Sequence, residues 1–266
     1  MINLTLYKQE MKNSFKILFI FSVVITLYVS IIMSMYNPDM MKTLDSIVES
    51  MPEIMASVGM TTGSTSLIGF MISYLYGFIL LIFPMLFCMI RANGLIAKYT
   101  DKGSMVTLLA APIKRKTLCL TQLCVLLSGL FFLVLYTTVL EIMIAEISFP
   151  NELMMSDLLI LNGSLFCLHL FIGSICFLCS CLFSDIKYSL GFGVGIPIIM
   201  YVLQMLANAG EKAEIIKYLT FFTLFDANGI IAHETNAMIG IILLFVGAIL
   251  LYSIGVMVFC KKDLHI

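Results

Sequence analysis

The chain has 266 residues and a formal net charge of −1, and its mean hydropathy is +1.07. Apolar residues make up 61% of it and charged residues 12%, which is about half the charged fraction of an ordinary soluble domain. This composition excludes a soluble globular protein and predicts a chain that lies almost entirely in a membrane.

Six apolar stretches predict six transmembrane helices, at residues 17–36, 67–90, 118–140, 158–183, 188–207 and 237–260. Each has about twenty residues or more, enough to cross a bilayer at about 1.5 Å per residue. No Lys, Arg or Asp lies near the middle of any stretch, where an ionised group is costly. The predicted fold is therefore all-α, a polytopic membrane protein with a single transmembrane domain over residues 1–266.

The segment before the first span has an amphipathic pattern. Apolar residues recur at helical spacing beside a stripe of lysines: Leu4, Tyr7, Met11 and Phe15 beside Lys8, Lys12 and Lys16. We predict an interfacial helix over residues 1–16, with its lysines at anionic lipid headgroups. The alternative is a simple extension of the first span.

Two further segments outside the spans have interpretable patterns. Residues 37–66 repeat apolar residues every three or four positions, which predicts an outer amphipathic segment that Pro52 divides into two pieces. Residues 210–236 are too short to cross the membrane twice as full helices. We expect them to form an outer cap or a pair of re-entrant half-helices.

The distribution of positive charge predicts the orientation. Twelve of the fifteen Lys and Arg residues fall on one side of the predicted spans, whereas twelve of the sixteen carboxylates fall on the other. Because Lys and Arg accumulate in cytoplasmic loops, we expect both termini in the cytoplasm. The first span is too long for a signal-peptide core and is read as a permanent anchor.

Candidate catalytic groups are few. Glu141 and Glu146 fall at the outer end of the third span, where we expect water to reach them, and His169 is interpreted as a hydrogen-bonded packing residue. The cysteines at 176, 179 and 181 have no His or carboxylate neighbours and are interpreted as packing residues. The chain contains no H-E-x-x-H and no G-x-x-x-x-G-K-[ST] motif. We expect no enzyme activity, metal or cofactor site in this chain, and no nucleic-acid partner.

The longest loop on the basic side, residues 91–117, has a helix-compatible start, a break at Lys102–Gly103, a second apolar turn and then Pro112 before a basic cluster. Its order is Gly94-Leu95-Ile96-Ala97, Asp101-Lys102-Gly103-Ser104, Leu108-Leu109, Ala111-Pro112-Ile113 and Lys114-Arg115. This order resembles the first cytoplasmic loop of the permeases of type-2 ABC exporters. Lys98 and Tyr99 stand where that family often has carboxylates.

The resemblance implies a membrane subunit of the ABC-2 type in a bacterial plasma membrane, with the loop as a cytoplasmic coupling helix. The loop would dock on a separate P-loop ATPase subunit, which would bind ATP and Mg, through Asp101, Lys102, Gly103, Ser104, Leu108, Leu109 and Pro112. A second permease chain, identical or a paralogue, would complete the pathway. The lining residues implied for it are Tyr76, Phe83, Tyr201, Gln204, Met205 and Asn208.

The expected function is therefore ATP-driven export of a hydrophobic or amphipathic cargo, such as a peptide antibiotic, a drug or a lipid-linked molecule, with a role in antimicrobial resistance. The alternative is a non-transporting membrane scaffold or sensor that recruits a cytoplasmic partner. A secondary carrier ranks third, because the sequence has no internal repeat and no charge at the middle of a span.

Overall fold

The computed structural model of the protein describes residues 2–60, 66–105, 108, 113–209 and 211–262, and this part of the chain contains helices and no strand. Six helices are long and apolar enough to cross a membrane. They are α1 (Leu4–Ser34), α5 (Ile79–Leu95) extended by α6 (Ala97–Asp101), α8 (Arg115–Ser148), α9 (Met155–Leu182), α10 (Ile186–Asn208) and α12 (Thr235–Lys261). The predicted all-α fold with six spans is confirmed, and the chain is a multi-pass membrane protein.

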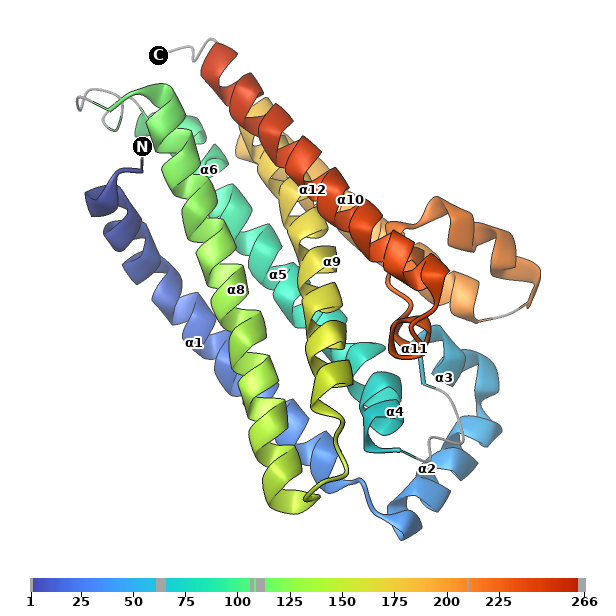
Figure 1. Ribbon diagram of the computed structural model, residues 1–266. Coiled ribbons are helices and arrows are strands. Elements are labelled where there is room, and N and C mark those ends of the chain that lie inside the picture. Colours follow the sequence, from blue (N-terminus) through green and yellow to red (C-terminus); the bar gives the residue numbers. More distant parts are fainter. Residues whose placement is uncertain (1, 61–65, 106–107, 109–112, 210, 263–266) are drawn as a thin grey trace.

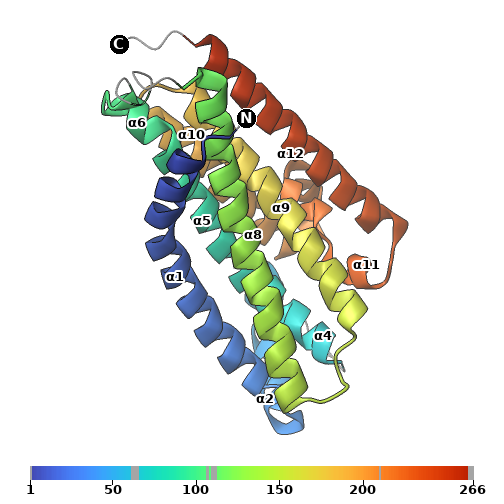
Figure 2. The same cartoon turned by 60° about the vertical axis from the view of Figure 1, so that its left-hand side comes forward.

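Helix α9 lies at the centre of the bundle and contacts α5, α8, α10 and α12 (Figures 1 and 2). Helices α1, α10 and α12 form the periphery and expose apolar side chains. Small residues let the backbones approach: a Cβ atom added at Gly173 of α9 would lie 2.7 Å from the hydroxyl of Tyr252 on α12. Such close packing holds helices together in a lipid environment, which supplies little hydrophobic force between them.

Both ends of the described chain lie at one end of the bundle (Figure 1). The backbone amide of Asn3 donates to Oγ1 of Thr121 at 3.0 Å, and the Arg115 side chain donates to the carbonyl of Lys262 at 2.9 Å. Both ends of the described chain therefore contact the first turns of α8. The helix order brings twelve Lys and Arg residues here, at positions 8, 12, 16, 91, 98, 102, 114, 115, 116, 187, 261 and 262. We call this the basic end. Its cytoplasmic location remains a prediction from the positive-inside rule.

The first helix differs from the prediction. Helix α1 is continuous from Leu4 to Ser34, so residues 1–16 do not form a separate interfacial helix, and the alternative of an extended first span describes the structure. The side chain of Asn3 caps the start by accepting from the Leu6 amide. The lysines are exposed, but Glu10 and Ser14 on the next face are buried. These contacts with the bundle hold the first turns in line with the span.

The second span also differs from the continuous helix expected over 67–90. It consists of α4 (Leu67–Met71), a π-helical turn η1 (Ile72–Tyr76) and, after a break at Gly77 and Phe78, helix α5. At the break the backbone of Gly77 passes close to residues 58 and 59, and a Cβ atom at Gly77 would lie 2.8 Å from the carbonyl oxygen of Val58. The contact with the end of the preceding segment therefore needs a glycine here.

The segments at the opposite end are short helices. The predicted outer segment forms α2 (Pro38–Ser50) and α3 (Pro52–Ser57), which confirms the division at Pro52, and its residues 61–65 lie outside the described residues. The segment 210–236, apart from residue 210, forms two 3-10 helices, η2 (Glu211–Leu219) and η3 (Phe221–Leu224), followed by α11 (Ala227–Ile231). None of these pieces is long enough to span the bilayer.

Candidate functional site

The loop predicted to dock an ATPase, residues 91–117, starts in the last residues of α5 and continues as helix α6, which ends before Gly103, a glycine with a φ of +68°. The break predicted at Lys102–Gly103 is thus confirmed. Asp101, Lys102 and Gly103 are exposed, and the Ser104 hydroxyl donates to the carbonyl of Tyr99 at 3.3 Å. Leu108 is half-buried against the core. Leu109 and Pro112 lie outside the described residues.

Hydrogen bonds tie α6 to two spans that follow it by more than eighty residues. The Ala97 amide donates to Oγ of Ser180 on α9 at 3.0 Å, and that hydroxyl donates to the carbonyl of Ala92 on α5 at 3.0 Å. The Asp101 carboxylate accepts from the Ile186 amide at the start of α10 at 3.2 Å. A carboxylate at a helix N-terminus is stabilised by the unpaired amides there. The base of the predicted docking loop is therefore attached to α9 and α10.

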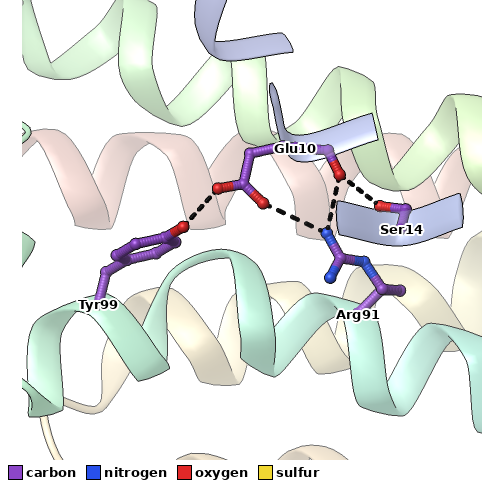
Figure 3. Close-up of polar contacts among 4 residues, drawn as sticks. All are labelled: Glu10, Ser14, Arg91 and Tyr99. Carbon is purple, nitrogen blue, oxygen red and sulfur yellow. Dashed lines mark hydrogen bonds and ion pairs between the residues drawn. The ribbon is translucent and has the colours of Figure 1, made fainter. Parts of the chain in front are cut away.

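A third tie joins the loop to α1 (Figure 3). Glu10 of α1 forms an ion pair with Arg91 of α5, with 3.4 Å between Oε2 and Nη2. Its other carboxylate oxygen accepts from the Tyr99 hydroxyl of α6 at 2.5 Å. The Glu10 carbonyl accepts from the Ser14 hydroxyl at 2.8 Å. The side chains of Glu10 and Arg91 are 3% and 8% exposed, so the pair is a buried one.

Sequence reasoning missed this group of residues, although two signals were present. Glu10 is the single acid before residue 39, and it sits among three lysines. Arg91 is one of two arginines in the chain and directly follows an apolar span. A cavity of about 460 Å³ lies beside the pair and is lined by the cations Arg91, Lys98 and Lys102 together with Glu10. This end of the bundle can accept an acidic surface.

A second cavity, of about 510 Å³, lies toward the opposite end between η1, α10 and the segment after α10. Five of the six residues named as pathway-lining face it: Tyr76, Tyr201, Gln204, Met205 and Asn208. Phe83 does not. Its ring packs instead against Phe21 and Tyr28 of α1, with centroids 6.1 and 5.8 Å away.

The walls of this cavity, called the outer cavity below after the side of the membrane on which the predicted orientation places it, are amphipathic. Gln204 donates to the Asn208 side chain at 3.1 Å and accepts from the Thr223 hydroxyl at 3.0 Å, so the amides are held in place. Lys217 and Asp226 add one charge of each sign to the lining. Aromatic rings with a few fixed polar groups are typical of sites for small organic molecules.

Next to the outer cavity lies a buried carboxyl group, which corrects an expectation. Glu141 of α8 was expected to be accessible to water, but it is fully buried. Its Oε2 accepts from the Tyr76 hydroxyl at 3.0 Å and from the Asn162 amide of α9 at 2.8 Å. The packing of η1 and α9 over α8 covers the group, and the sequence pattern of α8 alone does not reveal this.

His169 and Cys176 contact backbone carbonyl groups inside the bundle. Both ring nitrogens of His169 lie near backbone carbonyls, of Leu165 at 2.8 Å and Leu81 at 3.1 Å, and the side chain is fully buried. The thiol of Cys176 donates to the carbonyl of Gly193 at 3.0 Å, where α9 meets α10. In the described part of the chain, no three His, Cys, Asp or Glu side chains gather in a way that could hold a metal ion.

Comparisons with known proteins give one result. Neither the curated proteins nor the solved structures contain a match to the chain. A family model described as "Protein of unknown function (DUF2705)" matches residues 55–265, which is more than half of the chain and extends from within α3 through α12. The chain belongs to the DUF2705 family.

Proposed function

We propose that this chain is the permease subunit of an ATP-driven exporter of the ABC-2 type and that a separate P-loop ATPase docks at the basic end. The observation that carries the proposal is that the loop resembling the coupling loop of such permeases is hydrogen-bonded to three spans. Tyr99 contacts α1, Ala97 contacts α9 and Asp101 contacts α10. A force on this loop would reach most of the bundle.

These contacts supply a route from the loop to the outer cavity. Helix α10 has 23 residues, so it is about 35 Å long and can move as a rigid body. Its start is held by Asp101, and its last turns carry Tyr201, Gln204 and Asn208 into the wall of the outer cavity. A shift of the loop on ATP binding would therefore change the shape of that wall.

The outer cavity supports a cargo that is hydrophobic or amphipathic. Its volume of about 510 Å³ is in the usual range of ligand pockets, and its lining combines aromatic rings with side-chain amides. The exposed apolar faces of α1 and α10 offer surface for a second permease chain, identical or a paralogue, as well as for lipid. In this proposal the protein resides in a bacterial plasma membrane with both termini in the cytoplasm.

The test is coexpression with a candidate P-loop ATPase taken from a neighbouring reading frame, followed by copurification and measurement of ATP hydrolysis and cargo efflux. A double charge reversal, Lys98→Glu with Lys102→Glu, alters two exposed loop residues without touching the buried contacts. We expect it to abolish copurification and the coupled hydrolysis. Leu108 is a poorer choice for a variant because it packs against the core.

The matched control is Lys12→Glu with Lys16→Glu, which reverses two exposed charges on α1 at the same end. It should leave copurification intact. Equal loss in both variants would refute docking at the loop, because general charge would then explain the binding. A partner that binds without any ATP-dependent efflux would favour the scaffold or sensor instead of the exporter.

A further inference from the structure

Glu141 of α8 is a buried carboxyl group near the outer cavity. Its side chain is fully buried, and the described groups that contact it are the Tyr76 hydroxyl and the Asn162 amide. Both donate to one oxygen, Oε2. The other oxygen, Oε1, has no hydrogen-bond partner among the described residues. One carboxyl oxygen of Glu141 thus accepts two hydrogen bonds, and the other accepts none from the described residues.

No described cation compensates a negative charge at this position. Arg91, which forms an ion pair with Glu10, lies at the distant basic end. On α8 the next acid is the exposed Glu146. On α9 Asp157 lies near the start of the helix and His169 bonds to backbone carbonyls, and the other titratable groups are the thiols of the cysteines at 167, 176, 179 and 181, none of which is a cation. An ionised carboxylate without a positive partner is very costly to bury, so such a group takes up a proton.

The unpaired atoms also favour a bound proton. The amide oxygen of Asn162 is buried without a partner, like Oε1 of Glu141. Two unpaired acceptors in one cluster lack a donor, and a proton on Glu141 converts an acceptor into an O–H donor. Sodium is a poor fit, because a hard cation needs about six oxygen ligands and Oε2 already accepts two hydrogen bonds.

We propose that Glu141, Tyr76 and Asn162 form a proton-binding site that is loaded from the outer cavity. Tyr76 belongs both to the cavity wall and to the site, so its hydroxyl is the connection between them. Binding converts the carboxylate and one proton into a neutral carboxylic acid. Release requires water or a cation to reach Glu141, and this requires η1 to separate from α8. The inference does not depend on the proposed exporter function.

Infrared spectroscopy of the purified full-length chain in lipid nanodiscs tests the site without any ATPase. At neutral pH the wild-type protein should show the carbonyl stretch of a protonated, buried carboxylic acid. Exposed carboxyl groups are ionised at that pH and do not contribute. Glu141→Gln keeps an acceptor oxygen for the two donors and should lose the band, whereas Glu146→Gln, at an exposed acid of the same helix, should keep it.

The connection through Tyr76 has its own readout. On transfer into heavy water the band should shift as the bound proton exchanges for deuterium, and Tyr76→Phe should slow this shift several-fold. Absence of the band from the wild-type protein at neutral pH would overturn the proposal, whatever the variants do. Its persistence in Glu141→Gln would also overturn it, because another acid would then hold the proton. An unchanged exchange rate in Tyr76→Phe would overturn the route from the cavity.

Discussion

The guanidinium of Arg91 and the carboxylate of Glu10 lie 3.4 Å apart at the basic end, buried between α1 and α5. The same carboxylate receives the hydroxyl of Tyr99 from α6. Glu10 therefore connects α1 to two consecutive segments, α5 and α6, that follow it by about eighty residues or more (Figure 3). Removing either member of the pair would leave the other as an uncompensated buried charge, the costly way to break a buried ion pair.

Arg91→Met is expected to destabilise the folded protein by about 3 to 5 kcal/mol, because Glu10 would stay buried without its cation. Thermal unfolding in detergent measures the effect. It is followed by circular dichroism, because the chain has no tryptophan whose fluorescence could report unfolding. The double variant Glu10→Leu with Arg91→Met removes both charges and should be more stable than Arg91→Met alone. A double variant as unstable as the sum of the two single ones would mean that the ion pair is not coupled.

The sequence was sufficient for features that depend on local patterns. The six spans follow from apolar length, the division between α2 and α3 from Pro52, and the end of α6 from Gly103. Each of these is decided by the residues in the segment itself, such as the left-handed φ that favours glycine. Such features carry over directly from sequence to structure.

Other features depend on contacts between distant segments. Glu10 and Arg91 are 81 positions apart, and although Glu10 is the single acid before residue 39, the pattern of α1 does not indicate which distant residue it contacts. Glu141 is buried because η1 and α9 cover it, not because of its place near the end of α8. Five of the implied lining residues face the outer cavity, whereas Phe83 packs against α1. This difference also depends on tertiary contacts, because the sequence of a helix does not show which neighbour each of its faces packs against.

Gly77→Ala is expected to destabilise the protein by about 1 to 3 kcal/mol, the usual cost of overpacking. The new methyl group would lie 2.8 Å from the backbone oxygen of Val58, an atom that cannot rotate away. Unfolding by heat measures the loss. The matched control is Gly163→Ala in α9, where nothing beyond the adjacent backbone of its own helix lies within 4 Å of the added Cβ atom. Equal stability of the two variants would contradict a tight contact at the break in the second span.

The predicted orientation is tested by reporter fusions at the C-terminus. Because twelve cations gather at the basic end, a fluorescent protein fused after residue 266 should fluoresce and an alkaline phosphatase at the same point should be inactive. The same reporters inserted after Ser50, in α2 at the opposite end, should behave in the reverse way. An active phosphatase at the C-terminus would show that the topology is the reverse of the predicted one. The loop would then lie outside the cytoplasm, where a cytoplasmic ATPase could not bind it.

Substitutions in the outer cavity and at Phe83, whose ring packs against Phe21 and Tyr28, should affect cargo transport differently. Gln204→Leu removes an amide that bonds Asn208 and Thr223 in the cavity wall, and it should weaken cargo-stimulated ATP hydrolysis by roughly threefold to tenfold, as expected for one or two lost hydrogen bonds. Phe83→Leu loosens packing against Phe21 and Tyr28, so it should lower the thermal unfolding temperature without changing cargo dependence. Comparing the two variants separates the cavity from the packing of α1. If Phe83→Leu changed cargo dependence and Gln204→Leu did not, the pathway would lie along the α1 face and not in the outer cavity.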